Sequence, residues 1–102
     1  MKNQEALGLS DEQLDVIKKL KWDLKKEMIK QTAEIDVLEV DIDAALYEDT
    51  VDMEKVGGLI DQKYEYKKAK AKTIAGAVAE LKKILTEEQL AKLKELHYQN
   101  KQ

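Results

Sequence analysis

The fold of this chain is decided by two matching hexapeptides, Leu9-Ser10-Asp11-Glu12-Gln13-Leu14 and Leu85-Thr86-Glu87-Glu88-Gln89-Leu90. In each, a hydroxyl residue can cap the first free backbone N–H groups of a helix, and the glutamine three residues later can bond back to the cap. The leucine before the cap can pack on the leucine at the fourth helical position, and the acidic residues between them favour the positive end of the helix dipole. The two hexapeptides, called the first and second box below, therefore predict helix starts at Ser10 and Thr86.

An apolar stripe follows the first box and predicts a long helix over residues 10–47. Its members alternate by three and four positions, and no glycine or proline interrupts them. They are Leu14, Ile17, Lys21, Leu24, Met28, Gln31, Ile35, Leu38, Ile42 and Ala45. The segment 47–51 breaks this pattern and is the expected turn.

A second stripe predicts a helix over residues 52–84, with Asp52 as its cap. The residues that we expect to face the first helix are Met53, Val56, Ile60, Tyr64, Lys67, Ala71, Ile74, Val78, Leu81 and Leu85. The second box ends this helix and opens a short one over residues 86–98. Two helices of similar length joined by a short turn pack antiparallel. We therefore predict an all-α fold, a long antiparallel helical hairpin with a short C-terminal helix, in which the two boxes meet at the same end.

Length and composition indicate a single helical domain over residues 1–102. Charged residues make up 38% of the chain and all 18 basic residues are lysines, which suits long exposed helices better than a thick core. The absence of cysteine excludes disulfides and thiolate metal sites. No apolar run is long enough for a membrane span. We expect no signal peptide in this chain, because Met1-Lys2-Asn3-Gln4 is followed by no apolar stretch.

The charges lie in blocks along the chain. Residues 14–31 carry a net charge of +3, residues 32–54 hold nine acids and no lysine, and residues 55–83 carry a net charge of +5. An antiparallel hairpin would therefore have a basic body and an acidic tip.

The first helix has more apolar surface than one stripe needs. A second set lies on its opposite side and consists of Trp22, Ile29, Ala33, Val37 and Val40. A contiguous exposed apolar strip usually marks an interface, and a symmetric dimer requires such a face to be self-complementary. We predict a homodimer interface here; the alternative is burial under the third helix, which could cover Trp22 but does not easily reach Val40.

Residues that could support catalysis or metal binding are few. Ser10 is the only serine and is committed to a helix cap, and His97 is the only histidine. A transition-metal site normally needs three or four converging ligands, so we expect neither an enzyme nor a metal site, although a site shared between chains at His97 stays open. No nucleotide-binding loop is present, and we expect no cofactor and no membrane insertion.

Lysines and tyrosines alternate in the second helix. The residues in question are Lys63, Tyr64, Tyr66, Lys67 and Lys70. They could form a solvated face, or a surface for unfolded chains on which lysine stems and tyrosine rings make adaptable contacts and lysine charge speeds capture. Nucleic acid is the poorest alternative, because the chain has no arginine and is acidic overall, with a net charge of −3.

The two boxes resemble the paired Leu-Thr-x-x-Gln motifs of the Spy/CpxP family of periplasmic chaperones and stress proteins, which is related to periplasmic zinc, nickel and cobalt resistance proteins. The matching positions are Leu9, Ser10 and Gln13 in the first box and Leu85, Thr86 and Gln89 in the second. Serine replaces the threonine of the first motif. The resemblance covers residues 7 to 98.

This resemblance implies a thin, cradle-like homodimer located in the periplasm, which binds unfolded or partly folded proteins without ATP. A membrane-bound sensor is a further implied partner. The alternatives are a periplasmic metal sensor or metal-resistance accessory protein and a structural helical interaction module. The chain departs from both active types, because it is slightly acidic where the chaperones are basic and poor in histidine where the metal-binding relatives are rich.

Overall fold

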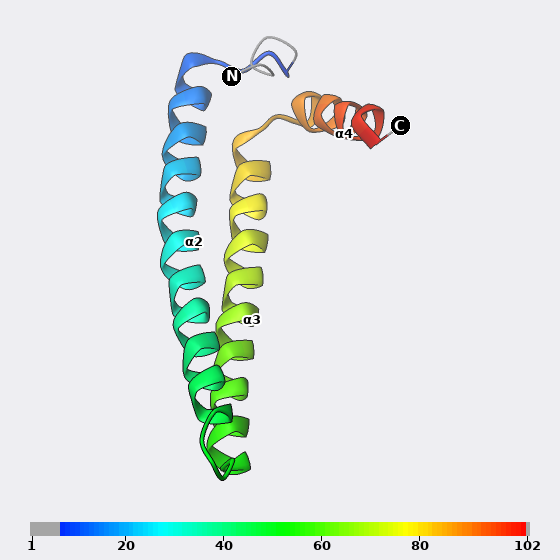
Figure 1. The fold of residues 1–102 in the computed structure, drawn as a ribbon. Coiled ribbons are helices and arrows are strands. Elements are labelled where there is room, and N and C mark those ends of the chain that lie inside the picture. The colour runs from blue at the N-terminus through cyan, green and yellow to red at the C-terminus, as the bar shows by residue number, and fades with distance from the viewer. Residues whose placement is uncertain (1–6, 102) are drawn as a thin grey trace. The chain divides into compact units, whose positions relative to one another are not determined.

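The computed structural model describes residues 7–101, and the side chains of residues 7–98. This part of the chain contains the helices α2 (Asp11–Leu46), α3 (Met53–Ile84) and α4 (Glu87–Lys101) and no strand (Figure 1). The all-α class and the three expected helices are confirmed, and α4 ends three residues beyond the expected Tyr98. The expectation about a signal peptide concerns residues that lie outside the described part.

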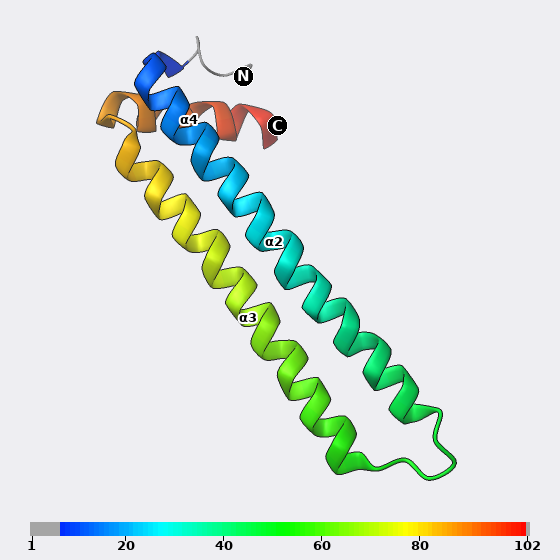
Figure 2. The same cartoon turned by 90° about the vertical axis from the view of Figure 1, so that its left-hand side faces the viewer.

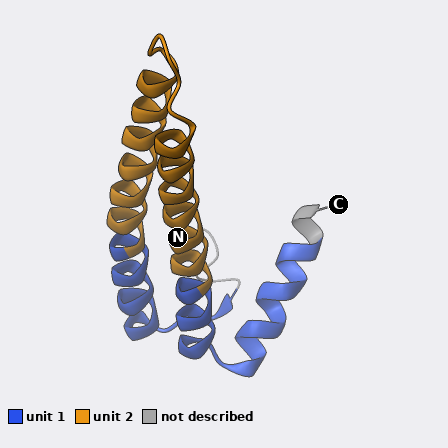
Figure 3. Ribbon diagram, turned by 90° about the horizontal axis from the view of Figure 1, so that it is seen from below, with its two compact units in different colours: residues 1–23, 76–102 blue, residues 24–75 orange. Residues whose placement is uncertain are grey.

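The chain divides into two compact units (Figure 3). Unit 1 comprises residues 1–23 and 76–102, and unit 2 comprises residues 24–75. Both α2 and α3 contribute a segment to each unit. That residues 1–102 form a single domain stays a prediction, because the two units are defined by their packing and not by whether they unfold together.

Unit 2 is an antiparallel pair of helix segments joined by the turn at residues 47–52 (Figures 1 and 2). The turn begins where the Tyr47 N–H donates to the carbonyl of Asp43 at 3.1 Å. It ends at Asp52, whose Oδ1 accepts from the N–H groups of Glu54 and Lys55 at 3.1 and 3.2 Å. The predicted cap is therefore confirmed. Four apolar residues form the buried core of this unit: Ile35, Leu38, Ala45 and Val56.

The predicted inward stripe of α2 is confirmed except at Lys21, which is exposed. The predicted stripe of α3 is wrong except at Val56, Leu81 and Leu85; Met53, at its start, is 67% exposed. Tyr64 and Ile74 are 58% and 42% exposed, and Ile60, Lys67, Ala71 and Val78 are exposed as well. The residues sheltered beside α2 are instead Leu59, Lys63, Lys70, Thr73 and Ala77.

Compared with the prediction, α3 is therefore rotated about its own axis, so that a different side of it faces α2. Two polar contacts accompany this rotation. The Gln31 Nε2 donates to Thr73 Oγ1 at 3.0 Å, and Lys63 Nζ lies 3.2 Å from Glu39 Oε1. A polar side chain such as Gln31 in an inward stripe needs a partner, because a buried unpaired amide is costly. Thr73 supplies that partner only when its own side of α3 faces α2, and the aliphatic stem of Lys63 can cover apolar surface in place of a hydrophobic residue.

Unit 1 holds the paired boxes and its own small core. Leu7, Ile17 and Leu85 are buried, and Gln89 is buried with them. Within the described residues, no helix combines the length and the apolar character that crossing a membrane requires.

Candidate functional site

Both boxes form the caps that their sequences predict. In the first, the Ser10 N–H donates to Gln13 Oε1 at 2.9 Å and the Gln13 N–H donates to Ser10 Oγ at 3.0 Å. In the second, the Thr86 N–H donates to Gln89 Oε1 at 2.9 Å and the Gln89 N–H donates to Thr86 Oγ1 at 3.2 Å. The two N-terminal caps are therefore complete capping boxes.

The two glutamines also bind each other, which the sequence did not reveal. Gln13 Nε2 donates to Gln89 Oε1 at 2.8 Å, and Gln89 Nε2 donates to Gln13 Oε1 at 3.1 Å. Each amide also donates to a carbonyl two residues before the other box's cap, Gln13 to Ile84 at 3.0 Å and Gln89 to Gly8 at 2.9 Å. We call this arrangement the amide clasp. It is pseudo-symmetric, because the glutamine of each box makes equivalent hydrogen bonds to the other box.

The amide clasp uses all the hydrogen-bonding capacity of both side chains. Each amide has two donors and two acceptor positions, and four contacts fill them in both residues. Gly8 contributes its carbonyl from a backbone with φ of 68°, a conformation that glycine adopts without strain. The clasp therefore ties the start of α2 to the junction of α3 and α4, and its amides are not available to a ligand.

The Lys-Tyr segment of α3 is divided between two sides of the helix. Lys63 and Lys70 are half-buried beside α2, whereas Tyr64, Tyr66 and Lys67 are exposed. Two ammonium groups lie near the Tyr64 ring: Lys63 Nζ is 5.9 Å and Lys67 Nζ is 5.3 Å from its centroid. The tyrosine ring and its lysines therefore form a mixed cationic and aromatic surface.

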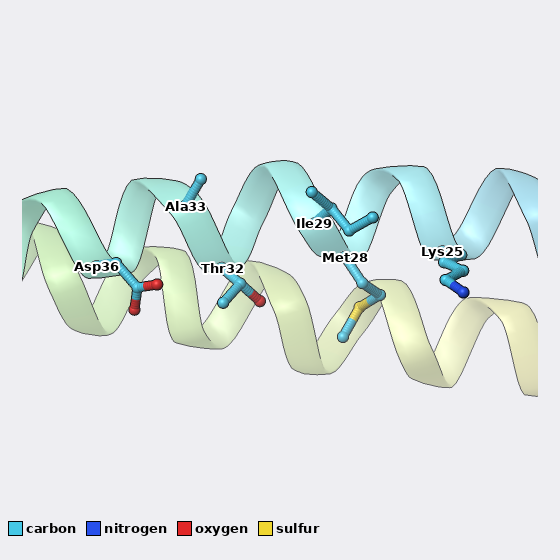
Figure 4. Close-up of a pocket in the computed structure, with 6 residues that line it drawn as sticks. All are labelled: Lys25, Met28, Ile29, Thr32, Ala33 and Asp36. Carbon is cyan, nitrogen blue, oxygen red and sulfur yellow. The ribbon is translucent and has the colours of Figure 1, made fainter.

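A shallow depression lies on α2 in unit 2 (Figure 4). Figure 4 shows Met28 and Thr32 pointing away from Ile29 and Ala33, so the depression wraps around one side of the helix. It is lined by Lys25, Met28, Ile29, Thr32, Ala33 and Asp36.

The depression and the exposed residues of α3 share one side of unit 2. Lys63 Nζ contacts both Glu39 on α2 and the Tyr64 ring on α3, which places that ring on the side where Glu39 lies. Glu39 follows Thr32 by seven residues and Asp36 by three, and such spacings keep residues on one side of a helix. We call this surface the apolar side of unit 2; it comprises Ile60, Tyr64, Lys67, Ala71 and Ile74 of α3 with Lys25, Met28, Thr32 and Asp36 of α2.

A second exposed surface lies on α2 opposite its buried stripe. Ile29, Ala33, Val37 and Val40 belong to unit 2 and are all exposed; we call them the α2 outer strip. Trp22, the fifth residue predicted for the interface, belongs to unit 1. It is also exposed, with Lys21 Nζ 5.4 Å from its ring centroid, so α4 does not bury it.

A comparison with protein families decides what these boxes are. The model of the LTXXQ motif family matches residues 1–97. The chain belongs to the LTXXQ motif family. This family contains Spy/CpxP-like periplasmic proteins. No curated protein and no solved structure matches the chain.

The amide clasp gives the LTXXQ motif of this chain a physical role. The threonine or serine caps a helix, and the glutamine both completes that cap and holds the other motif. The serine of the first motif makes the same cap contact as the threonine of the second, so the departure at Ser10 is conservative.

The LTXXQ family is not known for enzymatic activity. In this chain the Ser10 hydroxyl accepts a backbone N–H, and His97 lies in α4 with its ring centroid 6.1 Å from that of Tyr98. Among the described residues, no three or more histidine, aspartate or glutamate side chains are grouped so that they could hold a metal ion.

Sequence reasoning missed Ile60 and Ile74 as surface residues and did not find the depression. Both isoleucines carried the right apolar spacing but were assigned to the contact with α2. The signal that could have corrected this is Gln31, because a polar residue in the α2 stripe requires a polar partner on α3, and Thr73 is available.

Proposed function

We propose that this LTXXQ protein is a periplasmic, ATP-independent chaperone or envelope-stress protein of the Spy/CpxP type, which works as a homodimer and holds unfolded clients on the apolar side of unit 2. The observation that carries the proposal is the exposure of Ile60, Tyr64 and Ile74 on the side of the hairpin that also holds the depression. An exposed apolar surface with a polar rim is typical of an interaction site.

The surface suits clients that must be bound weakly. Its apolar side chains are already partly covered, so each would gain about 1 kcal/mol on further burial. A client that contacts four of them would gain about 4 kcal/mol, which corresponds to a millimolar dissociation constant. Two copies acting together would reach about 8 kcal/mol and the micromolar range before ordering costs. Weak contacts of this kind let a client bind and still fold.

The positive charge of the lysines would raise the rate at which acidic clients associate. Lys67 is exposed beside Tyr64, and Lys63 lies at the rim. Long-range attraction raises the association rate of acidic unfolded chains and fades as salt is added. Lys70 is half-buried beside α2, and Tyr66 is exposed on α3.

The test is suppression of the aggregation of a chemically denatured client, without ATP, at near-stoichiometric ratio. Replacing Tyr64 and Ile74 by serine should abolish most of the effect, whereas serine at Ala69, which is exposed on another side of α3, should not. Lys67→Glu should slow capture at low salt more than its exposed neighbour Lys68→Glu. No suppression by the unaltered protein at several-fold excess would overturn the proposal.

The family leaves two other functions open, a metal-resistance accessory protein and a structural interaction module that docks on a membrane-bound sensor. Neither is favoured by a specific contact in the described residues. The periplasmic location rests on the family alone.

A further inference from the structure

Five residues of α3 on the apolar side of unit 2 repeat with the period of a coiled-coil seam. They are Ile60, Tyr64, Lys67, Ala71 and Ile74, and their spacings alternate strictly between four and three. All five are exposed, and Ile60, Tyr64 and Ile74 are exposed by 38%, 58% and 42%. A period of 3.5 residues keeps a row of side chains against a second helix along its whole length. We call this row the α3 seam; α2 packs on a neighbouring side of α3 and leaves it open.

Two contacts across the hairpin show which residues of α2 and α3 lie level with each other. Gln31 bonds to Thr73 at 3.0 Å, and Lys63 pairs with Glu39 at 3.2 Å. The two helices of unit 2 run antiparallel (Figures 1 and 2), so the numbers of level residues add up to a nearly constant value, 104 and 102 in these two pairs. The depression on α2 can therefore be aligned with the α3 seam.

Small side chains meet at one level of this surface. Thr32 lies level with Ala71. Met28 lies level with Ile74, one turn farther toward the boxes. Thr32 and Ala33 line the depression next to Met28 (Figure 4). The α3 seam and the depression therefore border each other, and a large apolar side chain of a partner can enter beside Ala71.

The backbone of this surface favours a helical partner over an extended one. Both α2 and α3 are continuous helices through unit 2, so their N–H and C=O groups are bonded within each helix. An extended segment would receive no main-chain hydrogen bonds here, and some of its own N–H and C=O groups would face apolar side chains unpaired, which is costly. A helix brings its backbone hydrogen bonds with it and presents apolar residues at intervals of three and four, which match the α3 seam.

The charge within the α3 seam indicates one feature of the partner. Lys67 is its charged member, and the Lys67 Nζ lies 5.3 Å from the Tyr64 ring centroid. Lys63, beside α2, is instead paired with Glu39. A charged residue in an otherwise apolar seam selects a partner with the opposite charge at the facing position. Because Lys67 precedes Ala71 by four residues, the partner's acidic residue lies about one turn from the side chain that enters the depression.

From these observations, and resting on the proposed function, we propose that the apolar side of unit 2 binds amphipathic helices of its clients, either formed already or formed on binding, rather than extended segments. The bound helix has about 15 residues, because Ile60 and Ile74 are about 21 Å apart along α3. It lies along the α3 seam, places one large apolar side chain in the depression beside Ala71, and meets Lys67 with an acidic residue.

Two peptides of identical composition test this class of client. Each has about 15 residues, the length of the α3 seam, with leucines as its apolar residues and glutamate among the polar ones. In the first peptide the leucines are spaced alternately by three and four; in the second they occupy every second position. Short helices are marginal in water, so the first peptide should gain helical circular dichroism on binding the natural protein.

Fluorescence anisotropy of the labelled peptides measures their affinities. The first peptide should bind about tenfold tighter than the second, because only the first can turn all its leucines toward the α3 seam as a helix. A proline at its centre should remove this advantage, since proline breaks a helix. Equal affinities of the two peptides, or binding of the first without a gain in helix signal, would overturn the proposal.

Two alanines of α3 provide a matched pair of variants. Ala71 and Ala69 are both exposed, and glutamate is a good helix former, so Ala71→Glu and Ala69→Glu should both fold. Ala71→Glu places a charge inside the contact and should weaken the first peptide by about tenfold. Ala69→Glu, on another side of the helix, should change its affinity by no more than about twofold. Equal effects would show that the helix binds elsewhere and would overturn the proposal.

A charge exchange tests the facing position. Lys67→Glu should weaken the first peptide by about fivefold at low salt, and a peptide with lysine in place of the facing glutamate should recover the loss. Lys72→Glu, at a lysine exposed on another side of α3, is the matched control and should change the affinity by no more than about twofold. Equal effects of the two variants, or no recovery with the exchanged peptide, would overturn this placement of the helix.

The outcomes separate the helical client from the function on which it rests. Suppression of client aggregation without a preference between the two peptides overturns the helical client and leaves the chaperone function standing. No suppression by the natural protein at several-fold excess overturns that function and this inference together. If a second copy of the chain occupies the surface instead, the peptide affinity falls as the protein concentration is raised, and that result would also overturn the proposal.

Discussion

Replacing Gln89 by alanine should strongly destabilise unit 1. The substitution removes four side-chain hydrogen bonds, to the Thr86 N–H, to both polar atoms of the Gln13 amide and to the Gly8 carbonyl. Gln89 is only 7% exposed, and the space that alanine leaves would let water reach some of the groups left behind. Each lost bond contributes about 1 kcal/mol net, and partial hydration of the remaining groups reduces the total to about 3 kcal/mol.

That loss is large beside the roughly 5–15 kcal/mol that stabilises a typical domain. For a chain of this size it corresponds to a fall in Tm of about 15 °C. Thermal and urea unfolding followed by circular dichroism would measure it. Gln62→Ala, an exposed glutamine of α3, is the matched control and should change stability by about 0.5 kcal/mol at most.

The reciprocity of the amide clasp gives a sharper test. Gln13→Ala should also be destabilising, and the double variant should lose about 1–2 kcal/mol less than the sum of the single variants, because two of the bonds are shared. Strict additivity, or a loss below about 1 kcal/mol for Gln89→Ala, would refute the account of the motif as a clasp.

Gln89→Glu tests the same contacts through pH. One carboxyl oxygen would face the Gly8 carbonyl and the Gln13 Oε1, which are both acceptors. Burial and these acceptors raise the pKa of the new carboxyl in the folded protein above its unfolded value. An acid with a raised folded pKa is most stable at low pH and loses stability as pH rises. The variant should therefore lie furthest from the natural protein at pH 7 and approach it below about pH 4.

Three further predictions concern other parts of the molecule. Gly76→Ala should stabilise the protein by about 1 kcal/mol in thermal unfolding, because no atom lies within 4 Å of the added methyl group; destabilisation would reveal a contact in the assembled protein. Gln31→Leu should be neutral or stabilising by up to about 1 kcal/mol, because Gln31 Oε1 is buried without a hydrogen bond and Thr73 keeps its bond to the Ala69 carbonyl at 2.9 Å; a loss above 1 kcal/mol would show that the bond from Gln31 Nε2 to Thr73 contributes more to stability than the unpaired oxygen costs. Calorimetric titration with zinc, nickel and copper should show no stoichiometric binding; tight binding that disappears in His97→Ala would favour the metal-resistance alternative.

Local signals in the sequence were sufficient to predict where the helices begin and end. The caps at Ser10, Asp52 and Thr86 depend on contacts within three residues, so their patterns could be read directly. The meeting of the two boxes followed from the hairpin topology. These features are predictable because each is fixed by neighbouring residues or by helix length.

The rotation of α3 and the hydrogen bonds of the amide clasp could not be predicted from local sequence signals. Both depend on pairs far apart in sequence, Gln31 with Thr73 and Gln13 with Gln89. The apolar spacing of Ile60, Tyr64 and Ile74 is equally compatible with a buried stripe and an exposed surface. Only the polar partners across the hairpin distinguish the two, and they place these residues outside the contact with α2.

Site-specific cross-linking to an unfolded client tests the central claim most directly. A photoreactive side chain at Ile74, on the apolar side of unit 2, should capture a denatured acidic client efficiently and without ATP, and folded client should compete poorly. The same group at Ala69, on another side of the same helix, should capture little. Equal capture at the two positions, or none at Ile74 while the protein still prevents aggregation, would contradict the account.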